Sequence, residues 1–158
     1  MSINTILVAT DFSEHSQRAF EVANDLARQT GAKLCLLHVQ TENALRTAVK
    51  EGLLDNASTN EEIQSAIEQL TAGRFAQVIS GLGLSDVSIE KCSRRGDADA
   101  VIPAYAKEIG ADLLIVGRRG AGLIQGVRSA LLGSVTDAVI RKSPCPVMVV
   151  RREHTLKG

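Results

Sequence analysis

The sequence predicts a doubly wound α/β fold: a single five-stranded parallel sheet with helices on both faces. Short continuous apolar runs, clearest at residues 5–10, 33–39 and 111–117, are typical of strands buried on both sides. Segments with apolar residues at helical spacing lie between them, so five strands and four main helices alternate along the chain. The 158 residues contain no linker, repeat or low-complexity segment, and we expect residues 1–158 to form one domain.

The first strand–helix–strand unit has clear limits. TILVAT, residues 5–10, is a buried strand, Ser13 is a suitable N-cap for the helix that follows, and Gly31 closes that helix. KLCLLHV, residues 33–39, is the second buried strand. Two such strands joined by one helix imply a parallel pair with a right-handed crossover.

The middle of the chain predicts one long helix. Residues 40–59 are irregular, with at most a short helix, and the longer helix is expected to begin near Ser58 or Thr59. Glu61 and Glu62 follow at the spacing of a capping box. The apolar stripe of this helix consists of Ile63, Ile67, Leu70, Phe75, Val78, Ile79 and Leu82.

The C-terminal half continues the alternation. DVSIEKC, residues 86–92, alternates as a half-buried strand does, and Gly96-Asp97 opens a third helix. Further along, residues 130–142 predict a fourth helix and residues 146–151 the last strand. Each strand is thus followed by a helix on the way to the next, as a doubly wound sheet requires.

The charge balance argues against a nucleic-acid binder. Lys and Arg number 18, Asp and Glu also number 18, and only 3% of the residues are aromatic. A basic surface or stacking aromatic side chains would be expected of such a protein. The chain also lacks an apolar run long enough to span a bilayer, and its first residues lack the basic and apolar regions of a signal peptide.

The cysteines point to a reducing compartment. Cys35, Cys92 and Cys145 are widely spaced, odd in number and contain no CxxC pair. We therefore expect free thiols in a cytoplasmic protein, with neither a disulfide framework nor a metal site.

Standard catalytic and nucleotide-binding motifs are absent. GAGLIQG, residues 120–126, departs from the dinucleotide fingerprint in its spacing and in following a late strand, and no P-loop sequence occurs. No G-x-S-x-G elbow or HExxH helix is present. His38, at the end of a buried strand, is better explained as a hydrogen-bonded core or crevice histidine than as a general base. The sequence does not predict an enzyme.

Ligands of a doubly wound sheet bind at its carboxyl edge, where the strand order reverses. The segments that follow the first four predicted strands are therefore the candidate site: Thr10-Asp11, Val39-Gln40, residues 94–97 and residues 117–122. If the first and fourth strands are neighbours, Asp11 and Gly117 face one crevice.

VGRRGAGLIQGVRSALLGSV, residues 116–135, has the chemistry of an anion site. Gly117 and Gly120 let backbone amides approach a phosphate, and Gly133-Ser134 lies at a helix start whose free N–H groups attract negative charge. Hydroxyl and guanidinium groups nearby would add donors, from Ser134, Thr136, Arg118 and Arg119. From the residues alone, the alternative is a surface loop with glycines at its turns.

Four segments together resemble the universal stress protein family, of the UspA-like type: ILVATDFSEHSQRAF, LLHV, GADLLIVGRRG and LLGSVTDAVIRKSPCPVMVVR. The resemblance spans nearly the whole chain. It implies the strand order 3-2-1-4-5, which makes the first and fourth strands neighbours. It also implies a homodimer built on the last strand, residues 145–151.

The resemblance further implies the ATP-binding subgroup, with Mg²⁺ accompanying the triphosphate and a variant glycine motif. Binders are similar in carrying G-x-x-G, nine residues and then G-[ST]. Here twelve residues separate Gly120 from Gly133, which we interpret as a three-residue insertion. The residues implied to bind the nucleotide are Ala9, Thr10, Asp11, Val39, Gly117, Arg118, Arg119, Gly120, Gly133, Ser134, Val135 and Thr136.

The implied role is that of a stress-response regulator in which ATP, or a related adenine nucleotide, acts as a switch and not as a fuel. The alternative is a stress protein that binds no nucleotide and acts through protein contacts or phosphorylation. Hydroxyl groups that would accept phosphate are those of Ser13, Ser129, Ser134 and Thr136. Slow ATP hydrolysis is a weaker third interpretation, because no general base is evident.

Overall fold

The chain forms one five-stranded sheet flanked by helices. The computed structural model describes residues 1–42, 49–50, 52, 59–83, 86–118 and 133–151, apart from the side chains at positions 14 and 15. All strand pairs are parallel, and the strand order β3-β2-β1-β4-β5 confirms the predicted doubly wound fold class. The elements are β1 (Thr5–Thr10), α1 (Glu14–Thr30), β2 (Lys33–Gln40), α3 (Asn60–Gly81), β3 (Ile89–Arg95), α4 (Ala98–Glu108), β4 (Leu113–Gly117), α5 (Ser134–Lys142) and β5 (Val147–Val150).

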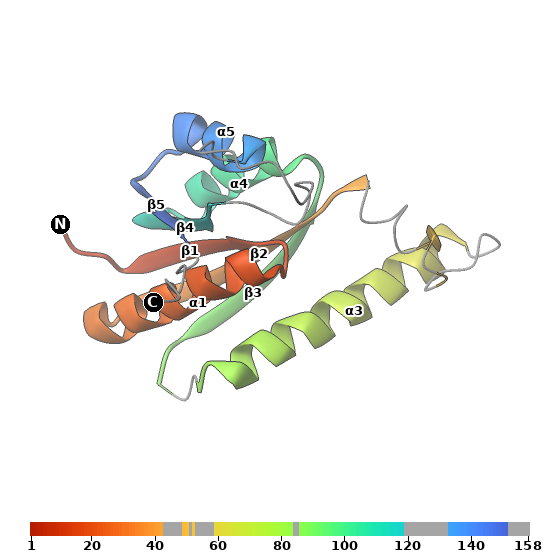
Figure 1. Ribbon diagram of the computed structural model, residues 1–158, viewed down its shortest axis with the longest axis horizontal. Helices are drawn as coiled ribbons and strands as arrows, with labels where there is room; N and C mark the ends of the chain where they lie inside the picture. Colours follow the sequence, from red (N-terminus) through yellow and green to blue (C-terminus); the bar gives the residue numbers. More distant parts are fainter. Residues whose placement is uncertain (43–48, 51, 53–58, 84–85, 119–132, 152–158) are drawn as a thin grey trace, which may run out of the picture.

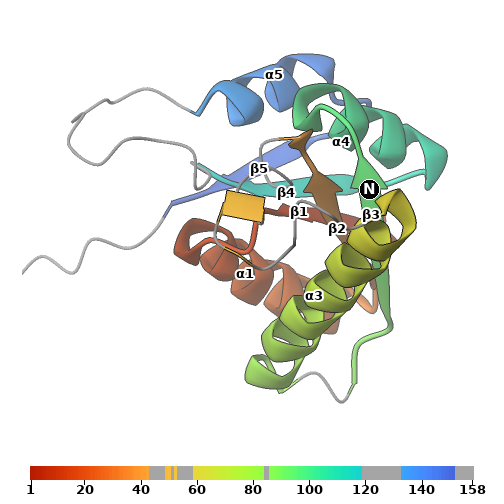
Figure 2. The same cartoon turned by 90° about the vertical axis from the view of Figure 1, so that its right-hand side faces the viewer.

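The helices lie in two layers, α1 and α3 on one face of the sheet and α4 and α5 on the other (Figures 1 and 2). Alternate side chains of the central strands enter two separate cores. Ile6 and Val8 pack with Phe20 of α1 in the first core, and Leu7 packs with Tyr105 of α4 in the second. Residues of both cores are almost fully buried, as expected for parallel strands covered on both sides.

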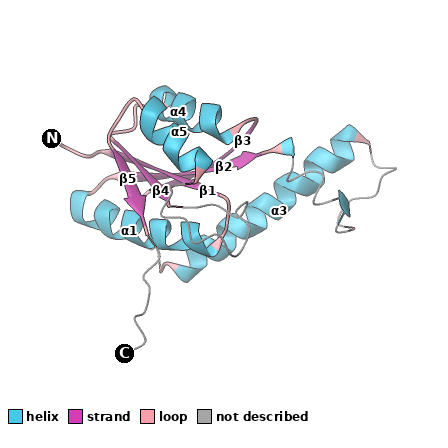
Figure 3. Ribbon diagram, turned by 45° about the horizontal axis from the view of Figure 1, so that its top comes forward, coloured by secondary structure: helices cyan, strands magenta, loops and turns pink. Residues whose placement is uncertain are grey.

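Helix α3 is the least buried of the helices. Only Thr71 and Phe75 are buried along its length, and its N-terminal part extends beyond the sheet (Figures 1 and 3). Its start is well defined, because the Thr59 hydroxyl accepts from the Glu62 N–H at 3.3 Å and the Glu62 carboxylate accepts from the Thr59 N–H at 2.8 Å. This reciprocal pair confirms the predicted capping box.

The limits of the first unit are also as predicted. β1 occupies residues 5–10, α1 begins after Ser13, and Gly31 ends α1 in a left-handed conformation with φ 73°. Glycine adopts this conformation without the steric cost that a Cβ imposes. β2 extends one residue past its predicted end, to Gln40.

Two predicted elements are displaced by three residues or more, whereas the fourth strand begins two residues late, at Leu113, and the last is one residue shorter at each end, Val147–Val150. The third strand runs from Ile89 to Arg95, three residues later than residues 86–92, because its register is set by pairing with β2 and not by its own apolar pattern. As an edge strand it is largely exposed, so apolar alternation marks only its beginning. The last helix begins at Ser134 and not at residue 130, because Gly133 has extended backbone with ψ 149°. Most of the short helix predicted before residue 52 lies outside the described residues.

Candidate functional site

The carboxyl edge of the sheet brings the ends of β1 and β4 together. β1 pairs with β4 with Ala9 opposite Val116, and with β2 with Thr10 opposite His38. Asp11 therefore follows β1 beside the end of β4, where Gly117 is the last strand residue. β1 and β4 are therefore neighbours, as the predicted crevice required. Val39 belongs to β2, on the other side of β1.

The two ends of the connection between β4 and α5 are bonded to each other. The Gly133 N–H donates to the Arg118 carbonyl at 3.1 Å, and the Thr136 hydroxyl donates to the Gly117 carbonyl at 3.0 Å. Thr136 is buried, with 5% of its surface exposed. Residues 117–118 at the end of β4 and residues 133–136 at the start of α5 are therefore joined at the sheet edge.

The N-terminus of α5 opens onto this edge. Gly133 is the N-cap and carries no side chain to bond the first N–H groups, while its own carbonyl accepts from the Asp137 N–H at 2.9 Å. The first N–H groups of a helix have no partner within the helix, and the helix dipole favours negative charge there. This end of α5 thus offers donors for an anion.

A cleft of about 660 Å³ lies between this helix end and the ends of β2 and β3. Its volume is in the range of small-molecule sites. The described residues that line it are Gln40, Thr41, Glu42, Arg95, Gly96, Asp97, Ala98, Asp99, Ser134, Val135 and Ala138. Ser134 and Val135 belong to the predicted site, and Gln40 directly follows the predicted Val39.

The cleft is lined by acidic residues, of which only Asp97 belongs to a segment predicted to form the site. Glu42, Asp97 and Asp99 contribute carboxylates to its lining, and Lys142 bonds Asp99 at 2.9 Å. The hydrogen bond and charge of Lys142 lower the pKa of Asp99. Gly96 and Asp97 lie in residues 94–97, one of the segments predicted to form the site, whereas Glu42 and Asp99 were not expected there.

The turn between β1 and α1 is held by its own hydroxyl and carboxyl groups. The Phe12 N–H donates to the Thr10 hydroxyl and the Ser13 N–H to the Asp11 carboxylate, both at 2.9 Å. The Thr10 hydroxyl donates to the Ser16 hydroxyl, which donates to the Ser13 carbonyl. Phe12 has φ 61°, a conformation that costs a bulky residue roughly 1–2 kcal/mol. The bonds at this turn offset that strain and fix Asp11 at the sheet edge.

His38 is a hydrogen-bonded crevice histidine. Its Nδ1 lies 3.0 Å from the Thr10 carbonyl, and a carbonyl only accepts, so Nδ1 carries the proton. Burial lowers the pKa of His38, with a smaller contribution in the same direction from Arg74. The ring is therefore neutral at neutral pH and is engaged by the turn, in agreement with the predicted assignment.

Arg118 is the one residue of the predicted arginine pair that the structure describes. Its N–H donates to the Val150 carbonyl at 2.9 Å, which joins the site to β5. Its Nε is buried and has no hydrogen-bond partner within the described ranges. A buried guanidinium nitrogen calls for an acceptor. Arg119 and Gly120 lie outside the described residues.

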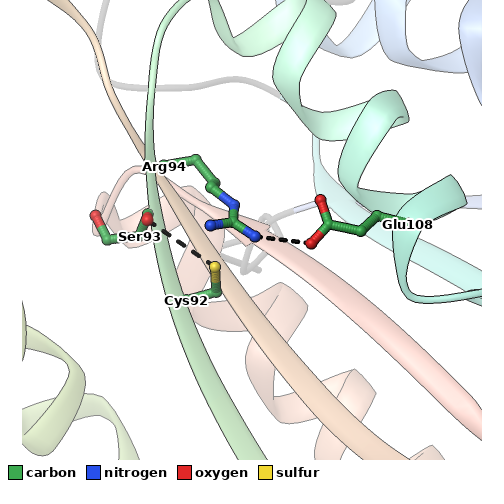
Figure 4. A network of polar contacts seen from close by, with 4 residues as sticks. All are labelled: Cys92, Ser93, Arg94 and Glu108. Atoms are coloured by element: carbon green, nitrogen blue, oxygen red, sulfur yellow. Dashed lines mark hydrogen bonds and ion pairs between the residues drawn. The ribbon is translucent and has the colours of Figure 1, made fainter.

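A second polar network lies on the edge strand β3 (Figure 4). Arg94 bonds Glu108 of α4 at 2.8 Å, and its guanidinium lies 5.2 Å from the centre of the Tyr105 ring. Burial and a hydrogen bond with Cys92 raise the pKa of Tyr105. Both charged partners are about half exposed, so the ion pair stabilises the fold by at most about 1 kcal/mol. This network joins strand to helix and does not line the cleft.

The described residues contain neither a metal cluster nor a membrane span. No three His, Cys, Asp or Glu side chains among them are grouped as metal ligands. Within the same ranges, no helix combines the length and the apolar composition that crossing a bilayer requires. None of the three cysteines is in a disulfide.

Fold and site define a class of protein: a doubly wound α/β chain with a cleft at the carboxyl edge and a helix N-terminus beside a glycine-rich connection. The model of the universal stress protein family matches residues 2–151, and the chain belongs to that family. Universal stress protein YxiE of Bacillus subtilis (strain 168) is 32% identical over 149 residues, which is 94% of this chain and 99% of the relative.

Solved structures agree with this assignment. The universal stress protein UspA from Lactobacillus plantarum is 27% identical with a TM-score of 0.69, covering 96% of this chain and 99% of its own. A universal stress protein in complex with cAMP is 25% identical with a TM-score of 0.59, covering 97% of this chain and 100% of its own. The predicted family is confirmed.

Proposed function

We propose that this universal stress protein binds an adenine nucleotide at the carboxyl edge between β1 and β4, with ATP as the physiological ligand. The observation that carries the proposal is the closure of the glycine motif: Gly133 bonds Arg118 at 3.1 Å and Thr136 bonds Gly117 at 3.0 Å beside the start of α5. A related universal stress protein has been solved in complex with cAMP, which supports an adenine nucleotide as the ligand class.

The charges of the cleft give the nucleotide a direction. The phosphates would lie at the N-terminus of α5, where the Ser134 and Val135 N–H groups are in the first turn of the helix, and the Arg118 guanidinium would add a charged donor. The carboxylates of Asp97 and Asp99 would repel phosphate, although Arg95 and Lys142 offset part of their charge, and the Gln40 side of the cleft would be left to the base. Asp11, after β1, would face the ribose.

Mg²⁺ would accompany the triphosphate. It binds nucleotides chiefly through phosphate oxygens and water, with one or two protein oxygens, and so needs no cluster of protein ligands. The Ser134 hydroxyl at the first turn of α5 is the protein group that we expect nearest the metal. Mg²⁺ there would neutralise phosphate charge and so favour the bound triphosphate.

Thermal unfolding with ATP–Mg²⁺, ADP, AMP, cAMP and GTP tests the proposal. A ligand at 100 times its Kd stabilises the folded state by about 2.7 kcal/mol, a measurable rise in Tm. We expect a rise with ATP–Mg²⁺ and little rise with GTP. No rise with any adenine nucleotide at millimolar concentration, and none retained on purification, would leave the alternative of a stress protein acting through protein contacts or phosphorylation.

The bound nucleotide would act as a switch and not as a substrate. His38, the histidine closest in sequence to the site, is engaged by the Thr10 carbonyl and its pKa is lowered, so it is a poor candidate for a base. We expect negligible phosphate release in a coupled assay and no phosphoprotein by mass spectrometry after incubation with ATP. Phosphate release that copurifies with the chain would show an ATPase instead.

We further propose a twofold homodimer through residues 145–151. β5 is an edge strand of the sheet, and Met148 on it is 37% exposed. An apolar edge favours pairing with a symmetry mate. Light scattering should give the dimer mass at micromolar concentration, Met148→Lys should give the monomer mass, and Lys91→Glu on the opposite edge strand should leave the dimer. A monomeric wild-type chain would refute this assembly.

The cytoplasm is the compartment that we propose. Cys35 is buried in the sheet, and the three thiols are free, which suits a reducing environment. Fractionation of cells that produce the chain, with disulfide-bonded periplasmic or secreted protein as the marker, would test the assignment.

A further inference from the structure

A cluster of three rings joins the turn between β1 and α1 to β2 and to α3. The Phe12 ring lies 4.6 Å from the His38 ring of β2 and 5.1 Å from the Phe75 ring of α3, centre to centre. The Arg74 guanidinium, also on α3, lies 5.8 Å from the centre of the Phe12 ring. Through Phe75 and Arg74, α3 thus contacts the turn that carries Asp11.

Phe12 is the only non-glycine residue with positive φ in the described part of the chain. A bulky side chain avoids this conformation unless the surroundings hold it. The rings of His38 and Phe75 supply such surroundings, because both pack on Phe12 in tilted or edge-on geometries that aromatic pairs favour.

The conformation of Phe12 decides where the Asp11 carboxylate lies. The Phe12 N–H donates to the Thr10 hydroxyl and the Ser13 N–H to the Asp11 carboxylate, both at 2.9 Å. Rotation of φ to a negative value would turn the Phe12 and Ser13 N–H groups relative to each other, and both bonds could not survive. Asp11 would then lose the hydrogen bond from the Ser13 N–H.

We propose that Phe12 is a positioning residue of the nucleotide site: its ring, held between His38 and Phe75, keeps the turn in its left-handed conformation and Asp11 at the ligand. The inference rests on the proposed function. The described residues that line the cleft do not include Phe12, so its effect passes through the turn. Coupling between two sites is reciprocal, so the bound nucleotide also strengthens the docking of α3.

Isothermal titration calorimetry with ATP–Mg²⁺ separates the contribution of the Phe12 ring to binding from that of the Phe12 backbone conformation. Glycine adopts φ 61° more readily than phenylalanine, so Phe12→Gly removes the ring without opposing the conformation. We expect Phe12→Gly and Phe75→Ala each to weaken binding by about tenfold, within the usual range of coupling between sites. Phe12→Tyr keeps the ring and should bind as the wild type does. Val78→Ala, on α3 in the same core, is the control that lowers Tm without changing affinity.

Amide hydrogen exchange adds a measurement that needs no nucleotide. The Ser13 N–H, which bonds the Asp11 carboxylate, should lose protection in Phe12→Gly and keep it in Val78→Ala. Unchanged Ser13 protection, or wild-type affinity in a folded Phe12→Gly, would overturn the inference. Absence of binding by the wild type would refute the proposed function, and the exchange data would still decide whether Phe12 holds the turn.

Discussion

The two connections that border the crevice are built in opposite ways. The turn between β1 and α1 is closed by side chains: Thr10, Asp11 and Ser16 bond backbone or one another, and Phe12 is packed by rings. The connection between β4 and α5 is closed at its ends by one backbone bond and one hydroxyl bond, to Arg118 and Gly117.

The difference separates two tasks. A turn whose side chains are already bonded to one another has a fixed shape and can orient a single carboxylate without a ligand. At the described ends of the second connection, the first N–H groups of α5 and the buried Nε of Arg118 have no side-chain partner among the described residues, and they would suit an anion. Under the proposed function, the first connection positions the Asp11 carboxylate and the second would bind the phosphates.

The largest effect is expected from Gly133→Val. A side chain at the N-cap would occupy the space in front of the first N–H groups of α5, where a phosphate would lie. Overpacking of this kind costs about 1–3 kcal/mol, or roughly fivefold to 150-fold in Kd, and with displaced phosphate we expect no measurable binding of ATP–Mg²⁺ by titration calorimetry. The control is Gly73→Val on α3, where an added Cβ meets no atom within 4 Å, and it should bind as the wild type does.

The next effect is that of Arg118→Gln. If the guanidinium bonds phosphate, its removal should weaken ATP binding by about 1.5–3 kcal/mol, which is roughly tenfold to 100-fold in Kd. The loss should be smaller for AMP than for ATP, since fewer charges remain to be bonded. Arg94→Gln, on the separate β3 network, should leave both affinities unchanged. Equal losses in the two arginine variants would mean a general effect of charge.

Thr136→Val tests the closure of the second connection. Valine keeps the shape but leaves the Gly117 carbonyl without the bond at 3.0 Å, which should cost about 1–2 kcal/mol of unfolding free energy in denaturant titrations. ATP affinity should fall several-fold with it. Thr30→Val removes a similar bond, to the Leu26 carbonyl at 2.8 Å at the exposed end of α1, and should change neither quantity by much.

The smallest effect expected is a pH dependence carried by His38. Its pKa is lowered by burial, so the unfolded chain binds a proton more readily than the folded one. Stability from this group is complete above the ordinary histidine pKa of 6.5 and is lost as pH falls through the lowered value. The charged groups that act on it are Arg74, which opposes protonation, and Asp11, which favours it. His38→Gln should therefore unfold with a flatter dependence of Tm on pH between neutral and acidic pH.

Much of the fold could be predicted from the sequence because its determinants are local. Gly31 ends α1 through a conformation that glycine favours, and the Thr59–Glu62 box begins α3 through side chains three residues apart. The register of β3 could not be predicted in the same way. It depends on bonds to β2, some fifty residues earlier in the chain, and an exposed edge strand carries little apolar pattern of its own.

The part of the site that could be predicted is the part whose chemistry is evident within a single segment of the sequence. Gly117 and Gly133 stood out because glycines at a strand end and a helix start favour anions, and the structure brings these two ends together. Asp97 lies in a predicted segment, residues 94–97, but Glu42 and Asp99 were not expected in the lining, since the cleft forms only when β2, β3 and α5 are assembled. The positive φ of Phe12 was equally hidden, because residue type does not reveal it.

The most direct test of the account is a titration of the ¹⁵N-labelled chain with ATP–Mg²⁺, followed by NMR. The account predicts saturable shifts of the Gly117, Gly133 and Thr136 amides, with small changes at Arg94. No shift of the first three at millimolar nucleotide, or shifts confined to β3 and α4, would contradict it.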